Sequence, residues 1–351
     1  MVWFSTVGLN METLCGVLEM ADMAKVPEGL AEVPKIEEAV PHALISDVLR
    51  HTRIVSSKQF CYNPTGTWRT DATPAPYKPK EAIGFHIVAN GTLWLDYDGA
   101  RRTLSEGDIV LLPFGASHWI GVGEGGPILD PGGDLPPPPW DKIPVMRYGD
   151  DEAEVRILCG YVISDIKDFA PFRSQLPELI HLSTQSPDGD DWLAAIVAQI
   201  IAEVDRPQVG SPQVLERLTE IALLEVLRRQ FVRSPSQVVG WVAAIQDQRL
   251  ANCLENIHNS PARNWTLTKL ASEAGQSKSS LSANFRKLLD MSPMQYLRQW
   301  RLFIASQELR RSNESIAEIA FKSCYGTEAA FSRAFKSCFG ASPAAWRERY
   351  R

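Results

Sequence analysis

The chain has 351 residues, 44% of them hydrophobic and 22% charged, which is the composition of an ordinary globular protein. This length allows two or three domains, and no apolar run reaches the about 20 residues that a membrane-spanning helix needs. The net charge of −6 is divided unevenly, because residues 241–351 hold 16 Lys and Arg against 9 Asp and Glu. An acidic body joined to a basic C-terminal third predicts that this third meets a polyanion.

The N-terminus and the cysteines indicate the compartment. Residues 1–43 are poorly patterned and begin without a basic region, which argues against a signal peptide. The six cysteines are scattered and include no CxxC pair, so a disulfide framework or a zinc finger is not expected. We therefore expect a cytoplasmic protein with reduced thiols and no membrane partner.

Residues 44–164 are expected to form a domain of mostly β structure. Short apolar runs are separated by turn dipeptides such as Asn90-Gly91 and Asp98-Gly99. This spacing is typical of the hairpins of a small barrel or sandwich.

The pattern becomes helical over residues 165–232. Ser211 and Pro212 are expected to begin a helix whose apolar stripe is wider than one surface face. Such a stripe fits either burial against its own domain or the interface of a homodimer. Residues 233–240 are the expected linker to the last domain.

One short pattern occurs twice in residues 241–351, at an offset of fifty. Leu281 and Phe285 in the first copy correspond to Phe331 and Phe335 in the second. Each copy predicts two short helices joined by a turn, which is the helix-turn-helix pattern. A continuous helix is expected between them, and two recognition helices about 34 Å apart can enter successive major grooves of DNA. This segment is predicted to be an all-α DNA-binding domain that folds alone.

Residues 241–351 resemble the DNA-binding domain of the AraC/XylS family of bacterial transcription regulators. The matching stretches are "WTLTKLASEAGQSKSSLSANFRK", "SPMQYLRQWRLFIASQEL" and "SIAEIAFKSCYGTEAAFSRAFKSCFGASPAAWR". The chain departs from the family at Ala283, where arginine is usual, and at Asp290 and Cys324, where glycine is usual. The resemblance implies double-stranded DNA and RNA polymerase as partners, and the direction of regulation stays open.

The resemblance also implies which side chains face DNA. Arg333 aligns with the arginine that relatives place in the groove, and guanidinium can pair with guanine O6 and N7. A phosphate contact or a solvated charge is the alternative for this residue. The candidate DNA-contacting residues are Lys278, Ser279, Ser282, Ala283, Arg286 and Lys287 in the first recognition helix, and Thr327, Glu328, Ala329, Ser332, Arg333 and Lys336 in the second.

The stretch "GDIVLLPFGASH" fits the second cupin motif, G-x5-P-x-G-x2-H, which ends at His118. Gly91 fits the glycine that closes the first cupin motif. The combination resembles AraC-like regulators with a degenerate cupin barrel as sensor, including those that answer reactive chlorine species. The expected class is α+β, with a degenerate cupin β-barrel, a helical dimer or linker region and an all-α double helix-turn-helix domain.

The cupin motif lacks three of its four usual metal ligands. Gly84 stands where the glutamate is expected, and Tyr77–Lys80 contain no histidine. Active cupin oxygenases need a complete ligand set with an open position. The chain is therefore predicted not to be an enzyme, and the alternative is a cupin metalloenzyme with an accessory DNA-binding domain.

Three side chains are expected to face the interior of the cupin-like domain. His86 lies two residues after Gly84, so it points to the same side of its strand, and His118 and Cys159 join it. This set either binds a metal such as zinc or is two hydrogen-bonded histidines with a packing cysteine. The effector is a small molecule or an oxidant, and an oxidant would act through Cys159 or Cys61.

Overall fold

The computed structural model describes residues 42–52, 54–73, 82–136, 140, 142–149, 154–184, 191–233 and 239–349. Predictions for residues 1–41 and for Tyr77–Lys80 lie outside these ranges. The first described element is the helix α1 (His42–His51), in a stretch expected to begin the β region. Leu44, Ile45 and Val48 are buried on one side of it, a helical rather than an alternating spacing.

The β domain consists of two sheets. The larger has the order β10-β6-β3-β9-β1-β8 and the smaller has the order β2-β7-β4-β5. The α+β class is confirmed, and these sheets are not closed into a single barrel over the described residues. The strands are β1 (Ile54–Pro64), β2 (Trp68–Asp71), β3 (Ala82–Asn90), β4 (Thr92–Tyr97), β5 (Ala100–Ser105), β6 (Ile109–Leu112), β7 (Trp119–Val122), β8 (Val145–Tyr148), β9 (Arg156–Ser164) and β10 (Ile180–Leu182).

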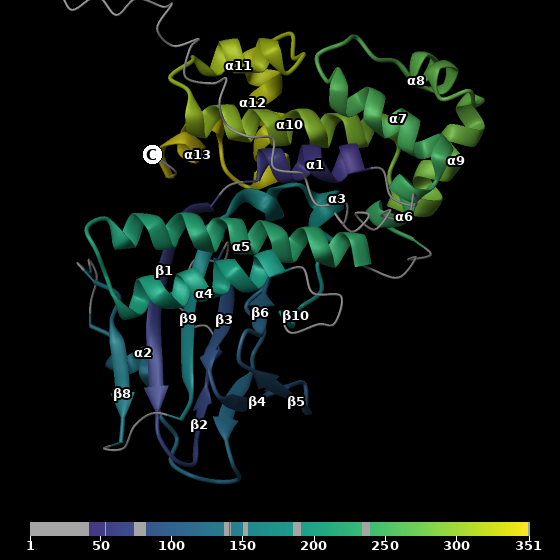
Figure 1. The fold of residues 1–351 in the computed structure, drawn as a ribbon. Helices are drawn as coiled ribbons and strands as arrows, with labels where there is room; N and C mark the ends of the chain where they lie inside the picture. Colours follow the sequence, from purple (N-terminus) through teal and green to yellow (C-terminus); the bar gives the residue numbers. More distant parts are fainter. Residues whose placement is uncertain are drawn as a thin grey trace, which may run out of the picture. The chain divides into compact units, whose positions relative to one another are not determined.

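The larger sheet is apolar on both faces, and each face has its own partner. Along β3, Ile83, Phe85 and Ile87 join the core that includes the helices, whereas Val88 joins the core between the sheets. Helices α4 (Asp191–Asp205) and α5 (Ser211–Arg233) lie side by side over β3 and β1 (Figure 1). This explains why β3 is buried along almost its entire length.

The last domain is all α. Helices α6 (Trp241–Gln246) and α7 (Gln248–Asn259) precede α8 (Leu267–Glu273) and α9 (Lys278–Leu289), which form the first helix-turn-helix. The single helix α10 (Pro293–Arg311) leads to the second, α11 (Ile316–Lys322) and α12 (Glu328–Phe339), and α13 (Pro343–Arg349) ends the fold. Three short elements interrupt the strands: α2 (Pro131–Asp134) lies between β7 and β8, and η2 (Asp165–Asp168) and α3 (Ala170–Arg173) lie between β9 and β10.

The hydrophobic cores do not follow the expected domain boundary. One core joins the helix-covered face of the larger sheet to α6–α9 and the first half of α10. Phe169 lies 5.1 Å from Trp300 and 5.7 Å from Tyr296, and Phe172 lies 5.6 Å from Trp241, ring centre to ring centre. This shared packing argues against the expectation that residues 241–351 fold alone. In the part of the chain that is described, no helix is long and apolar enough to cross a membrane.

Candidate effector site and nucleic-acid interface

A cavity of about 590 Å³ opens between the two sheets of the β domain. This volume lies within the range of small-molecule sites, about 300–1,000 Å³. The walls come from β1, β2, β3, β7 and β9 and from the α2 region, and they are mostly apolar. The lining includes Lys58, Phe60, Tyr62, Thr70, Asp71, Thr73, Phe85, His86, Leu112, His118, Ile120, Asp130, Trp140, Cys159 and Tyr161.

Strand alternation selects the side chains that reach this cavity. On β1, Lys58, Phe60 and Tyr62 recur every second residue and line it. On the neighbouring strands, His86 and Cys159 are directly opposite each other in the antiparallel β3–β9 ladder. Side chains at directly opposite positions share one face, so the register itself brings this pair together.

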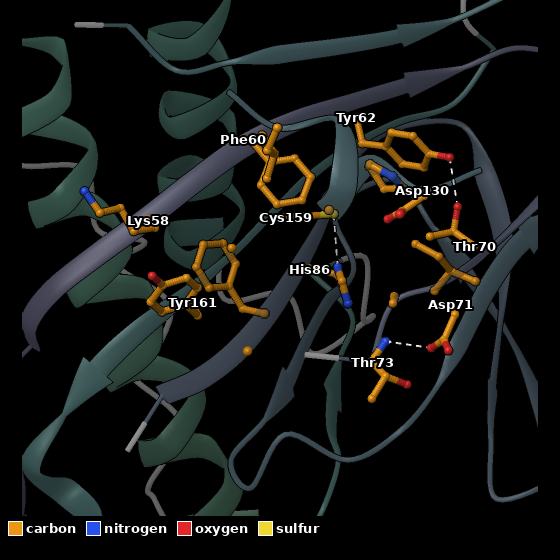
Figure 2. Close-up of a pocket in the computed structure, with 18 of the residues that line it drawn as sticks. Lys58, Phe60, Tyr62, Thr70, Asp71, Thr73, His86, Asp130, Cys159 and Tyr161 are labelled. Carbon is orange, nitrogen blue, oxygen red and sulfur yellow. Dashed lines mark hydrogen bonds between the residues drawn. The ribbon is translucent and has the colours of Figure 1, made fainter. Parts of the chain in front are cut away.

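The structure brings together His86, His118 and Cys159, as a linear chain of hydrogen bonds. Cys159 Sγ lies 3.1 Å from His86 Nδ1 (Figure 2), and His86 Nε2 lies 2.8 Å from His118 Nε2. His118 Nδ1 lies 2.8 Å from the carbonyl oxygen of Ala116. His86 and His118 are 7% and 2% exposed, so these contacts are shielded from bulk water.

The carbonyl of Ala116 determines where the protons lie when both rings are neutral. A carbonyl only accepts, so His118 carries its proton on Nδ1 and its Nε2 must accept. His86 then donates from Nε2 and carries no proton on Nδ1. His86 Nδ1 is therefore the acceptor for the Cys159 thiol.

The same geometry bears on the metal prediction for these residues. Cys159 is on the Nδ1 side of the His86 ring and His118 is on its Nε2 side, so the three do not converge on one point. Among the described residues, no group of three or more His, Cys, Asp or Glu is arranged to hold a metal ion. The hydrogen-bonded alternative describes this cluster better than a zinc site.

Cys61 is not brought to the cavity. It follows Phe60 on β1 and therefore points to the opposite face of the sheet, where its neighbour Gln59 donates to Thr219 of α5 at 2.7 Å. Burial raises the pKa of the Cys61 thiol to about 11, which keeps it protonated and unreactive. This placement disagrees with a sensing role for Cys61.

Sequence reasoning missed much of the cavity wall. The aromatic residue Phe85 lines the cavity, whereas Trp68 is in the core between the sheets. The alternation of Lys58, Phe60 and Tyr62 groups these residues on one face of β1, but it does not show that this face lines the cavity.

Each recognition helix begins at a side-chain cap. Ser277 accepts from the backbone nitrogen of Ser280 at the start of α9, and Thr327 accepts from Ala330 at the start of α12. The buried anchors Phe285 and Phe335 hold the inner faces. The outer faces are thereby turned away from the core and available to DNA.

The predicted DNA-contacting cations lie on these outer faces. All are exposed, and within the described ranges no hydrogen bond or ion pair engages their side chains. They are Lys278, Arg286, Lys287, Arg333 and Lys336. The shorter predicted contacts are also accessible, with Ser279, Ala283, Thr327, Glu328 and Ala329 exposed and Ser282 and Ser332 partly buried.

Each helix-turn-helix has two backbone positions in the left-handed region, and each fills one of them without glycine. In the first unit the pair is Gly275 and Asp290, with φ of 62° and 51°. In the second it is Cys324 and Gly340, with φ of 63° and 76°. Two of the three departures noted in the sequence, Asp290 and Cys324, therefore fall where a side chain raises the backbone energy.

A buried ion pair joins α10 to η2. Arg310 lies 3.1 Å from Asp165 and 2.7 Å from Asp168, and its guanidinium lies over the Trp346 ring. Arg310 is 8% exposed at its side chain and Asp165 is 2% exposed. The segment that follows β9 is thus attached to the helix that carries the second helix-turn-helix.

These features define a two-part transcription regulator, with a ligand cavity in a cupin-like domain and two DNA-reading helices. Residues 43–232 match the family model described as Cupin, and residues 270–349 match the one described as Helix-turn-helix domain. The chain belongs to the AraC-like transcription regulators.

Comparisons with individual proteins agree. An AraC-like transcription regulator of Streptomyces lividans is 32% identical over 252 residues, which cover 71% of this chain and 81% of the relative. The RCS-specific HTH-type transcriptional activator RclR of Escherichia coli is 23% identical over 77% of this chain and 85% of its own. The solved structure of ToxT from Vibrio cholerae O395 covers 85% of this chain and 98% of its own at 13% identity, with a TM-score of 0.31. At that TM-score the family assignment depends on the sequence matches.

Proposed function

We propose that this regulator binds double-stranded DNA through α9 and α12 and that an effector in the β-domain cavity controls the binding. The observation that carries the proposal is the pair of outward faces of α9 and α12, which the single helix α10 connects. Each face has exposed cations that are not engaged within the described residues. Two such faces suit two successive major grooves.

The effector cavity supports control by a small molecule. Its mostly apolar walls, together with the buried His86 and His118, are the usual composition of a ligand site, in which few polar groups fix orientation. The relatives that match most of this chain are named as transcription regulators, which supports a sensing role for the cavity. We therefore assign the cavity to sensing rather than to turnover.

The partners beyond DNA are also proposals. RNA polymerase is the partner implied by the class of regulator. A homodimer is supported by α5, on which Val214 and Ile221 are 42% and 40% exposed. Sedimentation of the full chain should show dimers that Ile221→Arg reduces, and a monomer at all concentrations would contradict this part. A regulator of transcription works inside the cell, which is where we place it.

The test of the function is selection of DNA from a random pool by the full-length protein. One enriched sequence with two half-sites about 10 base pairs apart is expected. Log affinity for it should fall with log salt at roughly 0.9 per phosphate contacted. Enrichment of no sequence, or affinity independent of salt, would contradict the proposal.

A further inference from the structure

The cavity contains a thiol next to a base. Cys159 lines the cavity and is hydrogen-bonded to His86 Nδ1, the ring nitrogen that lacks a proton when both histidines are neutral. A thiol reacts as its thiolate, so a neighbouring imidazole that accepts the proton supplies the reactive form. Regulation by binding alone does not require this arrangement.

The other described cysteines lack this arrangement. Burial raises the pKa of Cys253 to about 12 and that of Cys61 to about 11. Cys324 donates to the carbonyl of Ala262, and Cys338 is exposed on α12. Among the cysteines that the structure describes, Cys159 is thus the one hydrogen-bonded to an imidazole.

The size and lining of the cavity indicate the kind of molecule that reaches Cys159. A peroxide or a hypochlorous acid molecule needs little more room than a water, about 30 Å³. The cavity offers about 590 Å³, and Phe60, Leu112 and Ile120 line it. This space is much larger than a small oxidant needs, and it fits an organic molecule with an apolar body.

We propose that Cys159 captures small α,β-unsaturated carbonyl compounds in this cavity as a covalent adduct, with His86 as the base. His118 is a positioning residue. Its Nε2 accepts a hydrogen bond from His86 Nε2, so the proton of the neutral His86 ring stays on Nε2 and Nδ1 carries none. The proposal depends on the proposed function, in which the cavity is the effector site.

The reaction balances without any further reagent. The thiol proton passes to His86 Nδ1 as sulfur bonds to the β-carbon of the conjugated carbonyl compound. The electron pair of the C=C bond moves toward the carbonyl oxygen and forms an enolate. The imidazolium of His86 then returns the proton to the α-carbon, which leaves a thioether and two neutral histidines.

The strand that carries Cys159 also leads to the DNA-binding domain. β9 ends at Ser164, and Asp165 and Asp168 of η2 follow directly and hold Arg310 of α10. An adduct at Cys159 fills the cavity against β9 and so acts on the element whose next residues grip α10. Adduct formation is therefore expected to change affinity for DNA.

The experiment treats the full-length protein with 4-phenylbut-3-en-2-one, a conjugated ketone, and follows intact mass and peptide mass over time. We expect one added probe mass on Cys159, formed about a hundredfold more slowly in His86→Gln, as loss of a general base predicts. His118→Asn should also slow it, and His181→Gln, a histidine outside the cluster, should leave it unchanged. Adduct formation should shift the Kd for the selected DNA at least threefold, and Cys159→Ser should abolish both effects.

Several outcomes would overturn the inference. One is that the ketone labels Cys324 and Cys338 and leaves Cys159 unlabelled. Another is an unchanged rate of adduct formation in His86→Gln and His118→Asn. The rate is compared only for a variant that retains the native circular dichroism. A third is oxidation of Cys159 by hypochlorite with no reaction of the ketone. Affinity of the untreated protein for selected DNA is measured in the same samples, so a failure of DNA binding itself is recognised separately.

Discussion

The two helix-turn-helix units share a sequence pattern but differ in what supports them. The first, α8 and α9, is packed in the core that continues through α6, α7 and Phe169 into the β domain. The second, α11 and α12, has a separate core with α13 and the last part of α10, centred on Phe331 and Phe335. We therefore expect a change in the sensor to reach the first unit through packing, and the second unit through α10 and the Arg310 ion pairs.

The largest test of this difference uses the equivalent anchors Phe285 and Phe335, both fully buried. Each change to alanine should cost about 3–5 kcal/mol of unfolding free energy locally. Phe285→Ala should speed hydrogen exchange in the first unit and in α3, whereas Phe335→Ala should speed it in α11–α13 alone. Identical exchange patterns for the two variants would refute separate cores.

Substitution of Arg310 tests the link between the β domain and the second helix-turn-helix unit. Arg310→Ala removes the cation that faces the buried Asp165 and the partly buried Asp168, which should cost about 3 kcal/mol in urea unfolding. Replacing all three by apolar residues (Met, Leu and Leu) should recover most of that loss. The more exposed neighbour Arg311→Ala serves as the control, with an expected cost below about 1 kcal/mol. Equal losses for Arg310→Ala and Arg311→Ala would contradict the connection.

Acid should weaken the first unit through His258. Burial lowers the pKa of this ring to about 3, and His258 stacks on Trp300 and bonds to the Tyr296 hydroxyl. In the unfolded chain the ring has a pKa of about 6.5, so on acidification it binds a proton there while it stays neutral in the folded chain. The free energy of unfolding should therefore be unaffected by this ring above about pH 6.5, and it should fall as the pH drops, by about 2 kcal/mol at pH 5.

The measurement for His258 is urea unfolding at pH 7.5 and 5, with His258→Gln as the comparison. The variant has no titrating ring at this place, so its loss on acidification should be smaller by about the same amount. A wild-type protein and a variant with equal pH dependence would show that the ring titrates normally.

The DNA surfaces give a smaller effect. Arg333→Ala should lose roughly tenfold in affinity on the selected DNA and little on a scrambled site, because guanidinium reads guanine directly. Lys287→Ala should weaken both DNAs alike and lower the salt slope by about one. Equal weakening of the two DNAs by Arg333→Ala would assign this residue to a phosphate.

The smallest effect concerns the left-handed positions. Cys324→Gly should stabilise the second unit by about 1 kcal/mol, because it relieves the cost of a side chain at a φ of 63°. Asp290→Gly should gain less, since aspartate tolerates this region better. The matched control Gly275→Ala should lose about as much as Cys324→Gly gains, measured as Tm. A lower Tm for Cys324→Gly would mean that its bond to Ala262 matters more.

Local pattern was enough to predict the helix-turn-helix pair and the inward side of His86. Both depend on spacing along one element, such as the repeat of Phe285 at Phe335 or the period of two between Gly84 and His86. Because Cys61 follows Phe60 on one strand, the sequence predicts that the two side chains point to opposite faces. It does not show which of the two faces lines the cavity.

Pairings between distant elements could not be predicted in this way. The ion pairs of Arg310 with Asp165 and Asp168 join residues more than a hundred positions apart. The packing of Phe169 on Trp300 is similarly remote. No local spacing encodes such contacts, because they depend on how the domains dock. The linear rather than convergent order of the cysteine and the two histidines likewise depends on ring orientation, which the sequence does not contain.

The shared core has a consequence for how this regulator is degraded. A protease that cuts after α5 would release a fragment in which Trp241, Tyr296 and Trp300 have lost Phe169 and Phe172. That fragment presents bare aromatic surface and is a ready substrate for further proteolysis. We therefore expect a cut between the two parts to shorten the lifetime of the DNA-binding half as well.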